Sequence, residues 1–278
     1  MQKNNIVITG INGRMGQEIL KALTDNNRFL LVGAVARENS PLIGKSLTEA
    51  FQSEEKDIII NANLTEINAN IDAIIDFTSP EISLTYANFA CENKIPFITG
   101  TTGWNHKQEE IFKELAKKNI IVKSGNMSLG INLLAKIVEF TAGQLKAGCF
   151  DIEILEMHHR NKVDAPSGTA LLLGQAAAAG RKINLNECKK TVRDGQTGKR
   201  EEGEIGFATL RGGQVAGFHS VIFAGLDETL EFNHTAHNRK IFAQGALTAA
   251  EWAIKQKKTG LYSMQDIINF KGTNENDK

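Results

Sequence analysis

The stretch from Glu156 to Thr169 gathers the side chains best suited to proton transfer and to binding an anion. It reads Glu156-Met157-His158-His159-Arg160-Asn161-Lys162-Val163-Asp164-Ala165-Pro166-Ser167-Gly168-Thr169. The unperturbed histidine side chain titrates near neutral pH, and neighbouring cations favour an anionic substrate. We therefore expect a proton donor and an anion-binding pocket in this stretch.

The end of the same stretch predicts the start of a helix. Ser167 is a good N-cap residue, and an Ala- and Leu-rich segment, Ala170–Ala179, follows it. The first-turn N–H groups of Gly168 and Thr169 would then be available to a carboxylate. A helix cap beside a basic strand end, without a ligand, is the simpler alternative for this segment.

Metal chemistry is not expected from these residues. Adjacent histidines on an extended strand point to opposite faces, so His158 and His159 are poorly placed to share a metal ion. The three cysteines are far apart in the chain and form no C-x-x-C motif. That spacing argues against a zinc ribbon or a disulfide framework and suits a reducing compartment.

Charge and hydropathy exclude other classes of protein. Lys plus Arg and Asp plus Glu number 32 each, so no overall field favours nucleic acid or an anionic membrane. There is no apolar run of about 18 residues, the length that would predict a membrane span. A strand-like run is reached by Ile6, which leaves no room for a signal peptide. We expect a cytoplasmic protein with no nucleic-acid and no membrane partner.

A second candidate site is the glycine loop Gly10-Ile11-Asn12-Gly13-Arg14-Met15-Gly16. It follows an apolar strand-like run and precedes an amphipathic helix, which is the context of a dinucleotide-binding turn. Its glycines depart from the usual G-x-G-x-x-G spacing, so a glycine turn without a ligand is an alternative for the motif alone. As a phosphate loop it would offer helix N–H groups to a pyrophosphate.

The next strand indicates which dinucleotide is preferred. An acidic residue at its tip would bind the ribose diol of NAD, but here Ala36-Arg37 ends the run and Glu38 follows. A guanidinium at this place can pair with a 2′-phosphate, and Arg14 in the loop could assist. We predict that NADPH is preferred and that NADH is possible.

The elements that must position these residues alternate in the first half of the chain. Helical stripes such as Met15, Ile19, Ala22 and Leu23 separate strand-like runs. The alternation predicts βαβ units and a parallel sheet that binds ligands at the carboxyl ends of its strands. The expected strands are Ile6–Thr9, Leu30–Ala36, Asp57–Asn61, Ala73–Phe77, Pro96–Thr99 and Ile120–Lys123.

After about residue 127 the pattern changes. A helical stretch at 129–146 leads to the polar/apolar alternation Asp151–Ile154, which predicts a half-exposed strand. The polar segment Thr191–Gly203 predicts a loop, and the chain becomes helical again from Ile241. Three further strands separated by short turns predict an antiparallel meander: Ile205–Leu210, Val215–Ala224 and Thr229–His234.

Together these residues resemble the bacterial dihydrodipicolinate reductase family, also called 4-hydroxy-tetrahydrodipicolinate reductase. The most specific element is the string His158–Thr169, and the glycine loop alone would not carry the resemblance. The matching segments follow the family order along nearly the whole chain: Gly10–Gly16, Asp76–Thr78, Gly100–Gly103, Asn126–Gly130, Glu156–Thr169 and Ile205–Thr209.

The resemblance implies a fold and a reaction. The fold class is α/β, with a Rossmann-type parallel-sheet domain formed by residues 1–127 and 240–278. Residues 128–239 would form an α+β substrate-binding and tetramerisation domain with a mixed or antiparallel sheet. The reaction would be the NAD(P)H-dependent reduction of a small cyclic dicarboxylate in diaminopimelate and lysine biosynthesis, and the assembly a homotetramer.

The resemblance also implies roles for individual residues. His158 matches the proton donor and Lys162 its partner in carbon protonation, while His159, Gly168 and Thr169 match the substrate site. The positions that match the cofactor site are Gly10, Ile11, Asn12, Gly13, Arg14, Met15, Arg37, Gly100, Thr101, Thr102, Ser124, Gly125, Asn126 and Met127.

The chain departs from its better-known relatives at two places. They carry Glu where this sequence has Ala36, and some carry Ala-Ala-Asn-Phe where it has Ser124–Met127. The alternatives to this reductase are another two-domain NAD(P)-dependent oxidoreductase, such as an aspartate- or homoserine-type dehydrogenase, and a non-catalytic NADP-binding regulator. The dehydrogenases would lack the His158–Thr169 string, and the intact His158 and Lys162 speak against the regulator.

Overall fold

A computed structural model of the chain describes residues 3–24, 26–53 and 58–268. The residues group into two compact units. The first comprises Met1–Ser128 and Arg239–Ile267, and the second contains Leu129–Asn238. The chain therefore passes from one unit to the other at Ser128–Leu129 and again at Asn238–Arg239.

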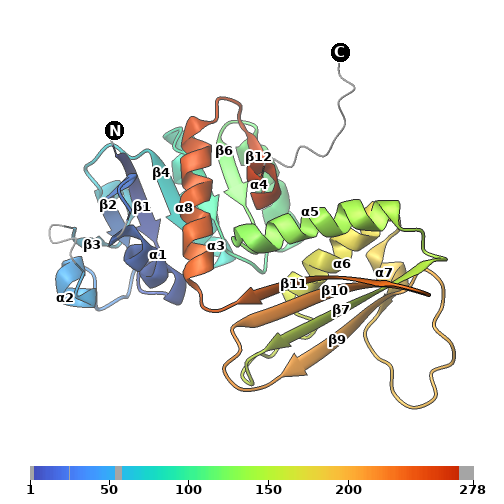
Figure 1. Ribbon diagram of the computed structural model, residues 1–278. Helices are drawn as coiled ribbons and strands as arrows, with labels where there is room; N and C mark the ends of the chain where they lie inside the picture. Colours follow the sequence, from blue (N-terminus) through green and yellow to red (C-terminus); the bar gives the residue numbers. More distant parts are fainter. Residues whose placement is uncertain (1–2, 25, 54–57, 269–278) are drawn as a thin grey trace. The chain divides into compact units, whose positions relative to one another are not determined.

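The first unit is built on a seven-stranded sheet with the order β12-β6-β5-β4-β1-β2-β3 (Figure 1). Every pair of neighbours runs parallel. Its strands are β1 (Asn4–Thr9), β2 (Phe29–Val35), β3 (Ile60–Asn61), β4 (Ala73–Asp76), β5 (Phe97–Thr99), β6 (Ile120–Lys123) and β12 (Gly260–Tyr262). The expected strand at 57–61 is shorter than predicted, and its first residue, Asp57, lies outside the described residues.

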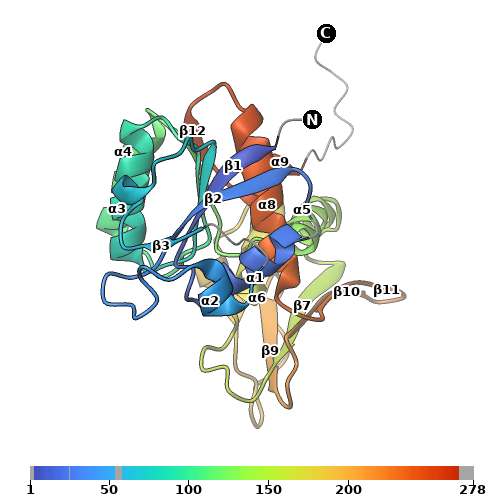
Figure 2. The same cartoon turned by 90° about the vertical axis from the view of Figure 1, so that its left-hand side faces the viewer.

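Helices cover both faces of this sheet, so its strands are apolar almost throughout, as parallel strands usually are. Figure 2 shows α3 and α4 on one face and α1 and α8 on the other. Along β1, Ile6 and Ile8 enter one hydrophobic cluster and Val7 enters the other. The helices are α1 (Arg14–Thr24), α2 (Leu47–Phe51), α3 (Pro80–Glu92), α4 (His106–Ala116), α8 (Lys240–Lys255) and α9 (Met264–Ile267), with a 3-10 turn at Leu64–Glu66.

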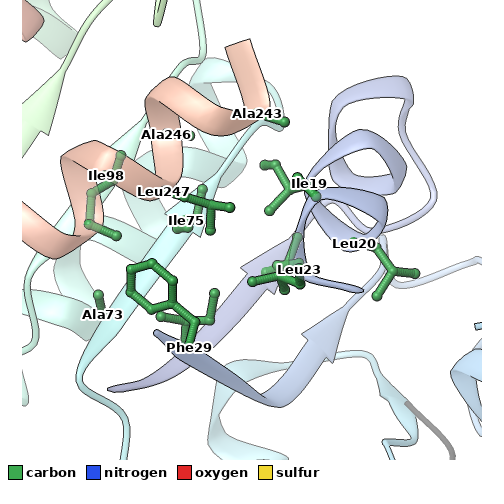
Figure 3. Close-up of a cluster of buried hydrophobic side chains, with 14 of the residues drawn as sticks. Ile19, Leu20, Leu23, Phe29, Ala73, Ile75, Ile98, Ala243, Ala246 and Leu247 are labelled. Carbon is green, nitrogen blue, oxygen red and sulfur yellow. The ribbon is translucent and has the colours of Figure 1, made fainter. Parts of the chain in front are cut away.

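Helix α8 completes the core beside α1 although it comes from the far end of the chain. Figure 3 shows Ala243, Ala246 and Leu247 of α8 beside Ile19 and Leu23 of α1, on the same face of the sheet. Small alanine side chains let the helix lie close to the sheet. α8 thus packs against α1 and strands β4, β5 and β6 of the first unit.

The second unit packs helices on one face of a five-stranded sheet with the order β11-β10-β7-β9-β8 (Figure 1). The inner face of β7 carries Ile152 and Ile154, which pack with α5 and α6 in one cluster. The elements are α5 (Leu129–Gln144), β7 (Phe150–His158), α6 (Gly168–Gly180), α7 (Leu185–Cys188), β8 (Lys189–Lys190), β9 (Ile205–Arg211), β10 (Gly217–Gly225) and β11 (Thr229–Ala236).

The expected antiparallel meander of the last three strands is wrong. β10 and β11 do form an antiparallel hairpin, but β7 lies between β9 and β10. β9 pairs with β7 in parallel, so the segment after β9 crosses over β7 instead of making a tight turn. The apolar inner face of β7 is best buried at the centre of the sheet, and the turn residues alone do not reveal this. The mixed sheet itself agrees with the expected fold class.

Candidate active site

The residues expected to bind a dinucleotide lie along one edge of the parallel sheet in the first unit. Strands β6, β5, β4, β1 and β2 are neighbours, and all of them end at this carboxyl edge. In open α/β sheets this is the edge at which ligands bind. The segments that leave it are, in that order, Ser124–Met127, Gly100–Thr102, Phe77–Ser79, Gly10–Met15 and Ala36–Arg37.

The glycine loop between β1 and α1 has a conformation that side chains would disturb. Gly10 has a φ of +70°, and a Cβ there would lie 2.9 Å from the carbonyl oxygen of Phe77. A Cβ on Gly16 would lie 2.4 Å from the carbonyl oxygen of Gly10, so the first turn of α1 packs directly on the loop. Ile11 anchors the loop, because its side chain is buried and its N–H donates to the carbonyl of Val35 at 3.1 Å. Such a backbone cradle lets a phosphate approach closely.

A cavity of about 270 Å³ lies beside this loop, and Gly10, Asn12, Gly13 and Arg37 are among its lining residues. The structure therefore brings Arg37 next to the glycine loop. Arg14 begins α1 and is exposed, but it is not among the described residues that line the cavity. Met15 packs partly against the hydrophobic core.

Tyr86, from α3, also lines this cavity. Burial, with a smaller contribution from the charge of Asp76, raises the pKa of Tyr86 to about 12. Its phenol therefore remains protonated at neutral pH.

A buried carboxylate, Asp76, organises the loops at this edge. It has no exposed surface and accepts hydrogen bonds from Thr9 at 2.7 Å, Thr99 at 2.9 Å and Thr101 at 3.0 Å. Thr78 and Ser83 also donate to it. These hydroxyls come from β1, β5, α3 and two connecting loops, so one side chain ties together the segments that surround the candidate cofactor site. In the sequence, Asp76 stands out only as the first residue of the motif Asp76–Thr78, which does not indicate this role.

The other expected cofactor segments are held by local hydrogen bonds. Thr101 is buried, and its hydroxyl accepts from the N–H of Thr78 at 3.0 Å. Ser124 donates through its hydroxyl to the carbonyl of Asn126 at 2.8 Å, and the side chain of Asn126 accepts from the N–H of Ser128 at 2.9 Å. Thr102 is exposed, and a Cβ on Gly125 would lie 3.7 Å from its methyl group. Met127 is buried.

In the second unit, His158 ends β7 and is bound by a carboxylate on the same strand. His158 Nδ1 lies 2.6 Å from Glu156 Oε2, because residues two apart on a strand share a face. Arg211, which is opposite His158 on β9, donates to both oxygens of Glu156 at 2.7 and 2.9 Å. Glu156 is 1% exposed. His158 was predicted from the sequence, whereas Glu156 and Arg211 had no predicted role.

The pKa of His158 reflects opposing influences. Burial lowers the pKa, the hydrogen bond and charge of Glu156 raise it, and the charges of Lys162 and Arg211 lower it. The resulting pKa of His158 lies below the ordinary value for histidine. For Glu156, burial raises the pKa, but hydrogen bonds from Arg211, His158 and the N–H of Ser167 outweigh it and hold the pKa below its usual value. Glu156 is therefore a carboxylate at neutral pH.

Helix α6 begins beside this group. Ser167 is its N-cap, and the Ser167 hydroxyl accepts from the N–H of Ala170 at 3.1 Å. Gly168 is exposed, and a Cβ there would meet nothing within 4 Å. Thr169 follows in the first turn and is half-buried. The expected N-terminus is thus present, with open space at its first residue.

Lys162 and His159 lie on the segment between β7 and α6. Lys162 forms an ion pair with Asp164 at 2.9 Å, and this hydrogen bond lowers the pKa of the Asp164 carboxyl. His159 is half-buried and comes directly after the last residue of β7. Both residues therefore lie on the short connection between His158 and the start of α6.

His219, on β10 opposite Glu156, was not singled out by sequence. It is 3% exposed, and burial with the nearby charge of His158 lowers its pKa to about 3. Its Nε2 lies 3.2 Å from the hydroxyl of Ser167. Because it stays neutral, it adds no positive charge beside His158. The alternation of buried and partly exposed residues along β10 could have indicated that His219 is buried. Its neighbours Glu156 and Ser167 could not be predicted, because they come from β7 and the N-cap of α6, far away in the sequence.

The described residues contain no group of three or more His, Cys, Asp or Glu side chains arranged to hold a metal ion. None of the helices in this part of the chain has the length and apolar character needed to span a bilayer.

Comparisons with known proteins cover both units. The family model described as dihydrodipicolinate reductase, N-terminus, matches residues 4–127, and the one described as dihydrodipicolinate reductase, C-terminus, matches residues 130–268. The 4-hydroxy-tetrahydrodipicolinate reductase of Bartonella tribocorum is 50% identical over 95% of this chain and 98% of its own length. That of Rhodopseudomonas palustris strain TIE-1 is 47% identical over 97% of this chain and 99% of its own length.

Solved structures agree on the fold. A dipicolinate-bound dihydrodipicolinate reductase from Paenisporosarcina sp. TG-14 is similar with a TM-score of 0.75 and 24% identity, covering 96% of this chain and all of that one (100%). Aspartate semialdehyde dehydrogenase II from Vibrio cholerae is similar with a TM-score of 0.56 and 14% identity, covering 92% of this chain and 99% of that one. The fold is thus similar both to that of a dihydrodipicolinate reductase and to that of an aspartate semialdehyde dehydrogenase.

Proposed function

Because the chain belongs to the dihydrodipicolinate reductase family, we propose that it reduces 4-hydroxy-tetrahydrodipicolinate to tetrahydrodipicolinate. The reaction is NAD(P)H-dependent and belongs to diaminopimelate and lysine biosynthesis. The observation that supports this function best is the arrangement in the second unit. A histidine held by a buried carboxylate lies beside an accessible helix N-terminus, which suits a dianionic substrate that must be protonated.

The first unit suits a dinucleotide. The conformation of Gly10 and the close packing of Gly16 on it form a backbone cradle that a Cβ would fill. Gly10–Met15 would hold the pyrophosphate, and Gly100–Thr102 with Ser124–Met127 would border the nicotinamide half. A reduced nicotinamide bound at this edge would supply the hydride.

NADPH is the preferred cofactor in this proposal, and NADH remains usable. Arg37 lines the cavity beside the glycine loop, and Ala36 before it is buried and carries no charge. A 2′-phosphate placed there would gain a charge-assisted hydrogen bond, whereas a carboxylate that could bind the ribose diol is missing from position 36.

The second unit binds the substrate and delivers the proton. The N–H groups of Gly168 and Thr169 donate to one substrate carboxylate at the first turn of α6, and His159 contributes a further substrate contact. His158 donates a proton to ring carbon, with Lys162 as its cationic partner. Lys162 lies on the short segment that joins His158 to α6, and its side chain forms an ion pair with Asp164 on the same segment.

The assembly in this proposal is a cytoplasmic homotetramer of subunits that join through the five-stranded sheet. Helices α5 and α6 cover its inner face (Figure 1), and the alternation of its strands gives the outer face a row of apolar side chains. Apolar side chains on an uncovered sheet face favour association with a second copy of the chain. The apolar residues of the outer face are Leu155, Met157, Leu210, Phe218 and Ile222.

The direct test is NADPH oxidation by the purified protein with enzymatically generated substrate. Turnover that depends on this substrate supports the proposal. Turnover only with an amino-acid or semialdehyde substrate would assign the chain to another two-domain dehydrogenase. Tight NADPH binding without any turnover would indicate a regulator that has lost the chemistry.

A further inference from the structure

The buried carboxylate Glu156 has more hydrogen-bond donors than a structural strand residue needs. His158 Nδ1 and Arg211 face Oε2, at 2.6 and 2.7 Å. A second nitrogen of Arg211, the N–H of Ser167 and the hydroxyl of Thr209 face Oε1, at 2.9, 3.0 and 3.3 Å. These donors come from β7, from β9 and from the residue that caps α6.

We propose that Glu156 is a positioning residue, which holds His158 through Nδ1, joins it to Arg211 and to the start of α6, and so directs Nε2 toward the substrate. The proposal rests on the proposed function, in which His158 delivers the proton. Glu156 does not touch the substrate itself. It acts indirectly, because it fixes the orientation of the His158 ring and favours its protonated form.

The hydrogen bonds determine which nitrogen of His158 carries the proton in its neutral form. All other partners of Glu156 are N–H or O–H donors, so the carboxylate has no hydrogen of its own to offer. Nδ1 must therefore be the donor, and the neutral ring has an unprotonated Nε2. The proton that His158 can deliver is then the one gained at Nε2 when the ring becomes an imidazolium.

The residue nearest to Nε2 at the start of β10 is a glycine, Gly217, which has no side chain to cover this nitrogen. A Cβ on Gly217, at the start of β10, would lie 3.2 Å from Nε2, closer than most such contacts. Glycine at this position therefore adds no side-chain atom beside the nitrogen that gains and delivers the proton. Any larger residue would crowd the nitrogen that the carboxylate has oriented.

Among the groups around the His158 ring, Glu156 is the one that stabilises the positively charged imidazolium. Burial disfavours the imidazolium most, the charges of Lys162 and Arg211 disfavour it as well, and the adjacent His219 is neutral. The charge and hydrogen bond of Glu156 are the opposing influence. Arg211 in turn neutralises part of that carboxylate, so Glu156 and Arg211 should change the pKa of His158 in opposite directions when each is removed.

A hydrogen bond from Ser167 also connects the Glu156 carboxylate to the expected substrate site at the start of α6. The N–H of Ser167 donates to Glu156 Oε1, and the next two residues, Gly168 and Thr169, begin α6. The proton donor and the expected carboxylate-binding turn are thus held by one side chain. Glu156 therefore holds the first turn of α6, where the substrate carboxylate is expected to bind, at a fixed distance from His158, which is expected to protonate the substrate.

The test is Glu156→Gln, which removes the charge and nearly preserves the shape. We expect kcat to fall about 10- to 100-fold, a part of the roughly 10²–10⁴-fold worth of a general acid. KM for NADPH should stay unchanged, because the residues expected to bind it lie in the other unit. The NMR titration of ¹³C-labelled histidine should show a lower pKa for His158 in this variant. The inflection of the kcat pH profile that reports deprotonation of the general acid should move to lower pH by the same amount. Glu156→Asp, which keeps the charge, should restore most of the pKa.

Two further variants separate this role from a structural one. Arg211→Met should raise the pKa of His158, the opposite of Glu156→Gln, and loss of packing alone would not produce opposite shifts. The matched control is Glu153→Gln, a carboxylate on the same strand that pairs with Arg193 and Arg200 on the other face. It should leave the pKa of His158 and the pH profile unchanged.

The outcomes distinguish this proposal from the proposed function. An unchanged His158 pKa and an unchanged kcat in Glu156→Gln would overturn the positioning role, even if the wild-type protein reduces the substrate normally. A wild-type protein without reductase activity would overturn the proposed function. In that case the two opposite NMR shifts would still show that Glu156 orients and charges His158.

Discussion

Single buried carboxylates organise both candidate sites of this protein. Asp76 gathers hydroxyl donors from several elements under the edge of the parallel sheet. Glu156 gathers N–H donors around His158 in the other unit. A buried charge is costly unless its hydrogen bonds are complete, so each carboxylate strongly favours one arrangement of the residues around it.

Loss of the proton donor should affect turnover and leave the fold intact. His158→Gln or Lys162→Ala is expected to lower kcat by roughly 10²–10⁴-fold, the usual contribution of a general acid. Steady-state kinetics with saturating NADPH measures this. His106→Gln, at an exposed residue of the first unit, is the control. Near-normal turnover in both single variants would contradict the assignment of the protonation step.

Arg37 should decide the choice between cofactors. Arg37→Ala is expected to weaken NADPH use by about 10- to 100-fold, since a hydrogen bond to a charged group contributes roughly 1.5–3 kcal/mol. kcat/KM with NADH should change little, because NADH has no 2′-phosphate. The comparison of kcat/KM for both cofactors measures this, with Arg14→Ala as a second variant. Equal use of the two cofactors, insensitive to Arg37→Ala, would contradict the preference for NADPH.

Among the elements, the contact between β1, the glycine loop and α1 matters most for the candidate cofactor site. The helix begins directly on the loop because Gly16 has no side chain to hold it away from Gly10. The same buried face of α1 packs Ile19 and Leu23 in one cluster with residues of the sheet and of α8. The position of the loop therefore depends on how closely the whole helix approaches the sheet.

Gly16→Ala should displace this helix. A Cβ would lie 2.4 Å from a backbone oxygen, which cannot move without the loop. We expect a loss of stability of about 1–3 kcal/mol from overpacking, together with weaker dinucleotide binding. Thermal unfolding and a binding titration with NADPH measure the two effects. Glu18→Gln, which removes only an exposed ion pair on the same helix, should change neither. Unaltered NADPH affinity in Gly16→Ala would argue against a pyrophosphate at this loop.

At the scale of the whole molecule, the outer face of the five-stranded sheet should control assembly. Leu210 lies on this face and is 48% exposed. Leu210→Glu would place charges within a subunit interface, so we expect smaller species in light scattering after size-exclusion chromatography. Leu226→Glu, at a 97% exposed leucine in the turn after β10, is the matched control and should leave the assembly unchanged. A monomeric wild-type protein would rule out the tetramer.

Local features of the sequence predicted much of the fold and of the candidate site. The glycine loop, the N-cap at Ser167 and the alternation of β7 depend on neighbouring residues, because backbone geometry and capping operate over a few positions. β6 was predicted with its observed bounds, Ile120–Lys123. The expected site residues therefore fell on the ends of strands and on the first turn of a helix.

What only the tertiary structure decided depends on residues far apart in the chain. The insertion of β7 between β9 and β10 follows from burying its apolar face, and nothing in the turns that flank β9 indicates it. The same insertion places Arg211 beside Glu156 and His219 opposite it, and so surrounds His158 with the groups that set its charge. The sequence determined which residues could do the chemistry; the order of the strands decided which partners hold them, because pairing across a sheet joins segments that no local pattern connects.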